Sequence, residues 1–192
     1  MLFVGLDPGK HGAVAWMDGT RKLVEVFDCP LICGEYDYAA MDGLLANALT
    51  ECRGEGLLVT MEEVHAMPTD GKCSAFSFGV GYGAWLALLG ARRMDLQLVS
   101  PRVWKRTMLA GIANDKQAEA GALKQRFQGH PICSQLHGPR GGLRDGRVDS
   151  LWLAEYGRMS HKLSGRALTP LVVDVPQTHV VDGRYRGRTR EE

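Results

Sequence analysis

Four acidic residues stand at positions from which they could together bind metal ions. Asp7 ends an apolar run near the N-terminus, Glu62 closes the run 56–62, and Asp145 and Asp149 stand four residues apart at the start of the segment 146–160. A lone carboxylate at a buried strand end costs several kcal/mol unless it meets a metal ion, a cation or several donors. Carboxylate oxygens are the ligands that Mg²⁺ and Mn²⁺ prefer, and two such ions about 4 Å apart can promote phosphodiester hydrolysis. The pattern therefore suggests a nuclease.

Simpler roles exist for some of these acids. Asp7 could cap the turn formed by Pro8 and Gly9, and Asp145 could be a helix N-cap. Asp149 has no such role, and like charges four apart on a helix repel unless a counter-ion joins them. Glu62 and Glu63 point to opposite faces of a strand, so only one of them can join Asp7.

Charge is unevenly distributed along the chain. The net charge of +1 divides into −7 for residues 1–91, +7 for 92–147 and +1 for 148–192, and arginines outnumber lysines 16 to 7. The basic middle segment could form a phosphate-binding surface beside the acids, or it could be a set of solvated faces.

The elements that must position these residues alternate between strands and helices. Period-2 and continuous apolar patterns predict strands, and apolar residues at spacings of three and four predict helices. The expected strands are 2–7, 12–17, 22–28, 56–62 and 96–100, and the expected helices are 41–52, 74–91, 114–127 and 146–160, with a new element opening at Pro101 and a loop over 128–143. This order predicts an α/β fold with a mixed sheet flanked by helices.

The 192 residues, 45% of them hydrophobic, are enough for one domain with a core, which we place at 1–164, followed by an extension at 165–192 with an isolated strand at 171–175 and a basic tail at 184–190. The sequence has no run of about 18 apolar residues and no signal-peptide layout. The odd number of cysteines, five, favours reduced thiols in a cytoplasm.

Two further patterns are weaker. Residues 79–84 (GVGYGA) fit a nucleotide fingerprint but lie in a helical stretch, so their small side chains fit close packing against the sheet or a second subunit better. The Cys29 and Cys33 pair and the group His130, Cys133 and His137 lack a matched second pair for zinc.

Three motifs in order resemble the RuvC family of Holliday-junction resolvases, especially its bacteriophage-type members. They are GLDPGKHGAVAW from Gly5, MEEV from Met61 and D-x3-D-S-L-x-L-A from Asp145, and the resemblance spans residues 2–160. It implies a ribonuclease H-like fold, a homodimer, and Mg²⁺-dependent paired nicking of four-way and other branched DNA in the cytoplasm of a bacterium or phage-infected cell, without a membrane.

The resemblance assigns catalytic and metal-binding roles to Asp7, Glu62 and Asp149, with two Mg²⁺ ions that Mn²⁺ can replace. The family's fourth acid lies three residues before the last one, where this chain has Gly146. Asp145, one residue earlier, is expected to take its place. Lys116 resembles a family lysine near the scissile phosphate and is expected to stabilise charge in the transition state.

The resemblance and the basic segment together suggest residues that contact DNA: His65, Lys72, Arg102, Lys105 and Arg106. His65 is expected to stack on the junction, with a metal-ligand role as the alternative. Trp104 lies among these basic residues and either stacks or belongs to the core.

Two other functions remain open. A junction-binding protein that does not cut is suggested by Gly146 in place of an acid. An actin-like ATPase is suggested by DPGKHG, although such enzymes duplicate the fold and 192 residues leave room for one copy.

Overall fold

The computed structural model describes residues 1–64 and 71–164. The expectations for His65 and for the extension at 165–192, with its strand at 171–175 and its basic tail, lie outside the described residues.

A five-stranded mixed sheet forms the centre of the molecule. Its strands are β1 (Leu2–Leu6), β2 (Ala13–Asp18), β3 (Val24–Asp28), β6 (Leu57–Glu62) and β7 (Asp95–Val99), in the order β3-β2-β1-β6-β7. The first three strands are antiparallel neighbours, whereas β6 pairs in parallel with both β1 and β7. The predicted mixed sheet is confirmed.

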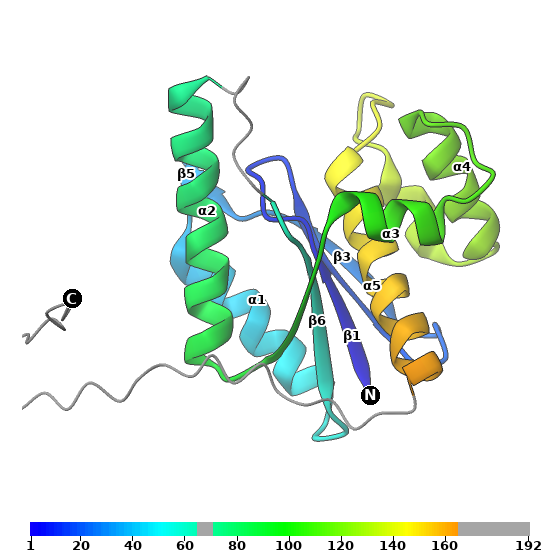
Figure 1. Cartoon of the computed structure of the whole chain (residues 1–192), viewed down its shortest axis with the longest axis horizontal. Helices are drawn as coiled ribbons and strands as arrows, with labels where there is room; N and C mark the ends of the chain where they lie inside the picture. The colour runs from blue at the N-terminus through cyan, green and yellow to red at the C-terminus, as the bar shows by residue number, and fades with distance from the viewer. Residues whose placement is uncertain (65–70, 165–192) are drawn as a thin grey trace, which may run out of the picture.

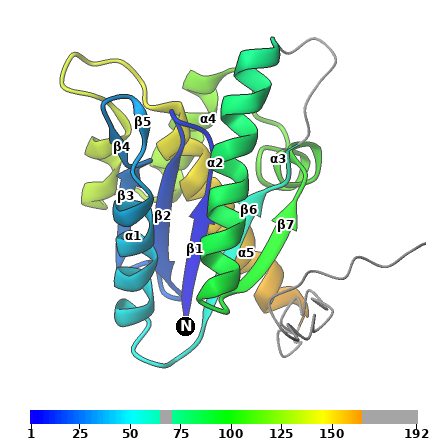
Figure 2. The same ribbon diagram turned by 90° about the vertical axis from the view of Figure 1, so that its left-hand side faces the viewer.

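Helices cover both faces of this sheet (Figure 1). One face carries α1 (Tyr38–Glu51) and α2 (Lys72–Ala91), which Figure 2 shows in front of the strands. The other face carries α5 (Asp145–Ser164), packed on β1, β2 and β6, together with α3 (Pro101–Met108), α4 (Lys116–Arg126) and the 3-10 helix η1 (Pro131–Leu136). The result is a three-layer α/β/α arrangement.

Most element bounds agree with the sequence predictions to within a few residues, and the differences concern short elements. The break at 30–34 forms a small hairpin of β4 (Leu31–Ile32) and β5 (Glu35–Tyr36), and the expected loop at 128–143 contains η1. Two-residue strands and a six-residue 3-10 helix are too short to show a periodic pattern.

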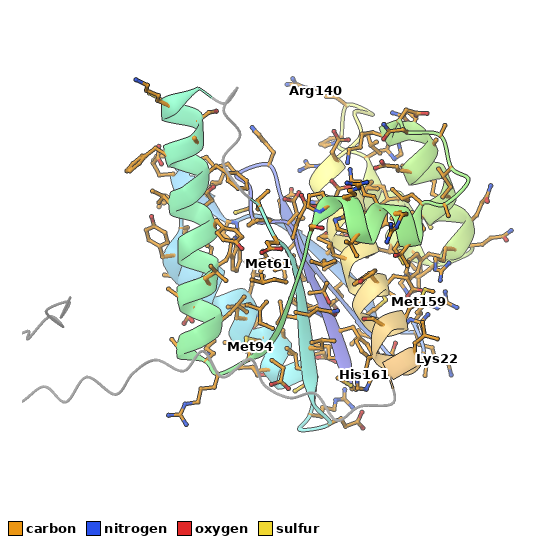
Figure 3. All side chains as sticks on the ribbon, viewed as in Figure 1. Lys22, Met61, Met94, Arg140, Met159 and His161 are labelled. Carbon is orange, nitrogen blue, oxygen red and sulfur yellow. The ribbon has the colours of Figure 1, made fainter. Side chains whose placement is uncertain are left out.

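Side chains alternate between the two layers along the central strands. Phe3 of β1 and Leu58 of β6 belong to the core beneath α5, while Val4 and Val59 belong to the core beneath α1 and α2. Figure 3 shows the same division, with Met61 between the sheet and α2, and Met159 on the α5 side. This alternation decides which face each strand-end acid can reach.

Gly5 allows α5 to lie directly against β1. A Cβ atom at this position would overlap the carbonyl oxygen of Ser150 and the backbone of Ala154. Both clashes are with backbone, so rotation of a side chain would not relieve them. The glycine in the first motif therefore sets how closely the last helix approaches the first strand.

The polar residue on the apolar face of α5, Glu155, is fully buried and compensated by arginines. Its carboxylate accepts hydrogen bonds from Arg158 at 2.6 and 2.7 Å and from Arg126 at 2.7 Å, and Arg21 lies 3.6 Å away. Although burial acts against the charge, these hydrogen bonds hold the pKa of Glu155 below its usual value. This cluster ties α4 and the β2–β3 turn to α5.

Helix α2 is long and apolar enough to cross a membrane by length and composition, within the part of the chain that the structure describes. A single such helix is weak evidence, because helices of soluble proteins pass the same test. Here Gly81, Trp85 and Leu89 of α2 are buried against the sheet layer.

We expect Gly5→Ala to destabilise the protein by on the order of 3 kcal/mol or more, because backbone atoms of α5 must move. The matched control is Gly43→Ala in α1, where an added Cβ meets nothing within 4 Å. That change should stabilise the protein by about 0.5–1 kcal/mol through helix propensity. Thermal unfolding followed by circular dichroism measures both, and equal melting temperatures for the two variants would contradict the proposed close approach.

Candidate active site

Asp7 and Glu62 lie side by side because of the register between two parallel strands. Leu6 of β1 pairs with Met61 of β6, so the next residues along both strands are Asp7 and Glu62. The preceding residues, Leu6 and Met61, face α1 and α2. Because side chains alternate along a strand, Asp7 and Glu62 face α5. The Gly9 N–H donates to Asp7 Oδ1 at a long 3.5 Å, so the turn contact considered for Asp7 exists but is weak.

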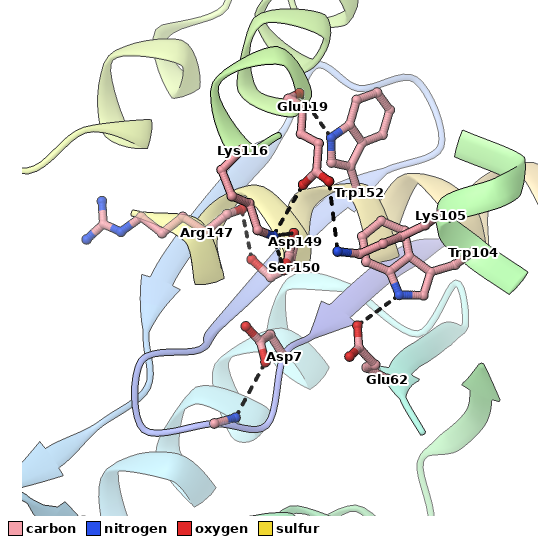
Figure 4. A network of polar contacts seen from close by, with 11 residues as sticks. Asp7, Glu62, Trp104, Lys105, Lys116, Glu119, Arg147, Asp149, Ser150 and Trp152 are labelled. Atoms are coloured by element: carbon pink, nitrogen blue, oxygen red, sulfur yellow. Dashed lines mark hydrogen bonds and ion pairs between the residues drawn. The ribbon is translucent and has the colours of Figure 1, made fainter. Parts of the chain in front are cut away.

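A tryptophan from α3 orients Glu62. The Trp104 side chain is fully buried, and its Nε1–H donates to Glu62 Oε2 at 2.9 Å (Figure 4). Glu63 lies toward the opposite face of the sheet. Burial of the Tyr82 phenol in α2 raises its pKa, and the negative charge of Glu63 raises it further. The prediction that the two glutamates face opposite sides of the sheet is confirmed.

Asp149 completes the group from the first turns of α5 and is paired with a lysine. Lys116 Nζ lies 2.7 Å from both Asp149 oxygens. Lys116 is the first residue of α4, which begins where the Asp115 side chain accepts a hydrogen bond from the Ala118 N–H at 2.9 Å. The predicted helix start at 114–117 therefore places the lysine at the site.

Burial and mutual repulsion perturb these groups. The pKa of Asp7 is raised to about 7, first by burial and then by the charges of Asp149 and Glu62. Burial also raises the pKa of Glu62, against the hydrogen bond from Trp104. Burial opposes the charge of Lys116, but Asp149 and Glu119 more than offset it and raise its pKa. Three carboxylates thus converge with one ammonium group, which leaves an excess of negative charge.

The donor set fits a hard divalent cation. Asp7, Glu62 and Asp149 offer oxygen ligands only, and a divalent ion would relieve the repulsion that raises the pKa of Asp7. Among the described residues, no three His, Cys, Asp or Glu side chains are already placed around one common point. Both oxygens of Asp149 instead contact Lys116, so an ion would have to compete with this lysine.

Asp145 is more exposed than the other three acids. It is the first residue of α5, its side chain is exposed, and it is not among the main charges that act on Asp7 or Glu62. At Gly146, a Cβ atom would overlap the His11 carbonyl oxygen and Gly12. The β1–β2 turn therefore leaves no room for an acid at the position where the resembling family carries one.

The predicted DNA-contacting residues that the structure describes lie on two helices, of which α3 contacts the site. Arg102 and Arg106 are exposed on α3, and Lys72 is exposed at the start of α2. Lys105, also on α3, lies over the Trp104 ring at 5.2 Å. His65 is outside the described residues.

One buried acid of the site, Glu119, was not predicted from the sequence. It lies on α4, is 2% exposed, and forms ion pairs with Lys116 at 3.2 Å and Lys105 at 3.9 Å. The signal was available, since Glu119 shares a helix face with the buried residues Ala120 and Leu123 and stands three residues after Lys116. Trp104 was expected to belong to the core or to stack, and its hydrogen bond to Glu62 was also missed.

Comparison with solved structures identifies the fold. *Thermus thermophilus* RuvC in complex with a Holliday junction substrate superposes with a TM-score of 0.56 at 16% sequence identity, over 86% of this chain and 96% of that one. A second *Thermus thermophilus* RuvC structure gives 0.54 at 18% identity, over 86% and 97%. The chain has a RuvC-like fold.

A third structure with this RuvC-like fold is the yeast mitochondrial Holliday junction resolvase Ydc2, with a TM-score of 0.55 at 14% identity, over 84% of this chain and 80% of that one. No protein-family model matches the chain, and no curated protein matches it by sequence. At these identities the likeness establishes the fold, and the ribonuclease H-like architecture expected from the sequence is confirmed.

We expect the contribution of Asp7 to the stability of the metal-free protein to become less favourable as pH rises from about 4 to about 7. The folded protein retains the Asp7 proton up to about pH 7, whereas the unfolded chain releases it near 3.8, so folding binds a proton in this range. Ionising Asp7 in the folded state therefore costs up to about 4 kcal/mol, fully expressed above pH 7.

The measurement is urea unfolding of the parent and Asp7→Asn in EDTA at pH 4 and pH 8. At each pH, the free energy of unfolding of the parent is subtracted from that of the variant. This difference should be larger at pH 8 than at pH 4, by a few kcal/mol. If the difference in unfolding free energy between the two proteins is the same at pH 4 and pH 8, the folded protein does not raise the pKa of Asp7.

Proposed function

We propose that this chain is a metal-dependent endonuclease that resolves four-way DNA junctions, and other branched DNA, by paired nicking. The observation that carries the proposal is the convergence of Asp7, Glu62 and Asp149 with Lys116 at one end of the sheet, on a fold shared with Holliday junction resolvases. Residues 1–164 would form the nuclease domain. The five free cysteines support a reducing compartment, such as the cytoplasm of a bacterium or a phage-infected cell.

Asp7, Glu62 and Asp149 would hold two Mg²⁺ ions, or Mn²⁺ in their place. Such ions activate a water molecule and stabilise the leaving oxygen of a phosphodiester. Trp104 fixes the orientation of the Glu62 carboxylate through its 2.9 Å hydrogen bond. Lys116 keeps a positive charge beside the reacting phosphate, where it stabilises charge that develops in the transition state.

DNA would lie across α3 and the N-terminal end of α2. Arg102, Lys105 and Arg106 would contact phosphates next to the acidic site, and Lys72 would extend this surface. We also propose His65 as a stacking contact at the junction. Support comes from *Thermus thermophilus* RuvC, whose structure was solved with a Holliday junction substrate.

A homodimer would form through the outer face of α2. A stripe of apolar and small residues on this face is exposed in the chain: Phe76, Gly79, Val80, Gly83, Ala87 and Gly90. Phe76 is 76% exposed, although it is one of the largest apolar side chains of the helix. Small residues at spacings of three and four let two helices approach closely, while Phe76 and Val80 supply apolar area.

The dimer would match its substrate. A twofold assembly presents two equivalent active sites to a nearly twofold junction, so that opposed strands are cut in pairs. Melting temperatures that shift with added nucleotide would favour the actin-like alternative instead.

The first test is cleavage of a labelled four-way junction and a matched linear duplex, with and without Mg²⁺. The parent should cut the junction only with Mg²⁺. Asp7→Asn and Glu62→Gln should each lose at least about 100-fold in rate, because each removes a charged oxygen ligand. Glu63→Gln is the matched control, since the neighbouring acid faces α2, and it should cut within about twofold of the parent.

The outcome of this assay separates cutting from binding alone. The absence of a side chain at Gly146 favours a junction-binding protein that does not cut, and tight junction binding without nicks in Mg²⁺ or Mn²⁺ would establish that function instead. Asp145→Asn tests the fourth acid. A loss comparable to that of Asp7→Asn would show that Asp145 turns into the site when ions and DNA are bound.

The second test changes the α2 stripe. Gly83→Glu should convert the dimer to a monomer in size-exclusion chromatography with light scattering, because a charge replaces a small residue where two helices meet. An added Cβ at Gly83 meets nothing within 4 Å in the chain itself, so the monomer should fold normally. Ser74→Glu, exposed on another side of the same helix, is the control and should remain dimeric.

The substrate should report the same change. On a cruciform plasmid, the Gly83→Glu monomer is expected to leave nicked circles where the parent leaves linear DNA. A Gly83→Glu protein that stays dimeric would refute the α2 interface.

A further inference from the structure

Glu119 is a buried carboxylate whose charge is balanced by lysines alone. It is 2% exposed on the apolar face of α4, and within the described residues its ion-pair partners are Lys116 at 3.2 Å and Lys105 at 3.9 Å. Its Oε2 atom makes no well-aligned hydrogen bond. A carboxylate buried in this way costs several kcal/mol unless cations stay close to it, so Glu119 draws both lysines toward itself.

The backbone of Glu119 is held in place from the helix that carries Asp149. Its carbonyl oxygen accepts a hydrogen bond from Trp152 Nε1 at 3.3 Å, and Trp152 follows Asp149 by three residues on α5. Glu119 therefore keeps a set position relative to Asp149, and Figure 4 shows both carboxylates in contact with the Lys116 ammonium group.

Lys116 is divided between these two carboxylates. Its Nζ atom lies 2.7 Å from both oxygens of Asp149 and 3.2 Å from Glu119 Oε2. A divalent ion bound by Asp149 would repel the ammonium group that now contacts both of its oxygens. This repulsion favours movement of the lysine away from Asp149, and Glu119 is an acceptor already within reach.

We propose that Glu119 is a positioning residue that receives Lys116 when a divalent ion takes the Asp149 oxygens. It keeps the ammonium group beside the reacting phosphate while removing its competition with the ion. This inference rests on the proposed metal-dependent function and deepens it. Glu119 itself touches neither ion nor DNA in this scheme, and acts through Lys116.

Lys105 connects Glu119 to the surroundings of Glu62, the acid at the end of β6. It forms an ion pair with Glu119 and lies over the ring of Trp104, whose indole N–H is bonded to Glu62. Glu119 thus lies between the two lysines that flank the carboxylates from β6 and α5.

The experiment measures Mn²⁺ binding to the full chain without DNA, by electron paramagnetic resonance of the free ion, so that no activity is needed. In Glu119→Gln, Lys116 loses its second carboxylate and stays on Asp149, and the Kd for Mn²⁺ should rise about tenfold, the worth of one charge-assisted hydrogen bond. Lys116→Met removes the competitor, and the Kd should fall below that of the parent.

The double variant isolates the coupling between the two residues. Adding Glu119→Gln to Lys116→Met should leave the Kd unchanged, because the lysine that competes with the ion at Asp149 is already absent. An equal rise in Kd with and without Lys116 would make Glu119 a direct ligand or a structural residue and would overturn the inference. No rise in Glu119→Gln, or no fall in Lys116→Met, would overturn it as well.

Two controls separate this result from other failures. Glu155→Gln also removes a buried, paired carboxylate, but one whose partners are Arg126 and Arg158, so it should lower the melting temperature without changing the Kd. The parent should bind Mn²⁺, and Asp7→Asn and Asp149→Asn should each weaken that binding. If the parent does not bind Mn²⁺, or if neither variant weakens the binding, the proposed function fails, and the inference fails with it. Binding that depends on these two acids but not on Glu119 overturns the inference alone.

Discussion

The site depends on the cost of gathering carboxylates in a half-buried place. Asp7, Glu62 and Asp149 come from β1, β6 and α5, and they raise the pKa of Asp7 to about 7 through burial and repulsion. Such a cluster would open or take up protons unless cations joined it. Lys116 supplies one positive charge in the metal-free chain, and the remaining excess of negative charge would favour binding of a divalent ion.

Close backbone approach turns acids that are far apart in sequence into one group. The parallel register of β1 and β6 aligns the two strand-end acids, and Gly5 lets α5 come near enough to add Asp149. The same closeness has a chemical consequence at Gly146, where the β1–β2 turn leaves no space for a side chain. The tight seating of α5 therefore limits the acids at the site as well as assembling them.

The sequence predicts those parts of the molecule that follow from local pattern. The apolar runs place Asp7 and Glu62 at strand ends, alternation separates Glu62 from Glu63, and the capping residue Asp115 places Lys116 at a helix start. The gathering of Asp7, Glu62 and Asp149 was also expected, but the contacts that orient and balance these acids were not. The hydrogen bond from Trp104 to Glu62 and the burial of Glu119 depend on how α3 and α4 dock on α5, and no spacing along the chain encodes that docking.

If Asp149 binds a metal ion as proposed, its contact with Lys116 creates a conflict between stability and function. Without an ion, the contact between Lys116 and Asp149 stabilises the folded chain, because it neutralises part of the carboxylate cluster. With an ion, the same contact would weaken binding. A second carboxylate placed on the far side of the lysine resolves the conflict, since the ammonium group keeps a partner in both states. The burial of Glu119, which is unfavourable by itself, becomes understandable on this basis: an exposed acid at that place would be solvated and would hold the lysine too weakly to draw it from Asp149.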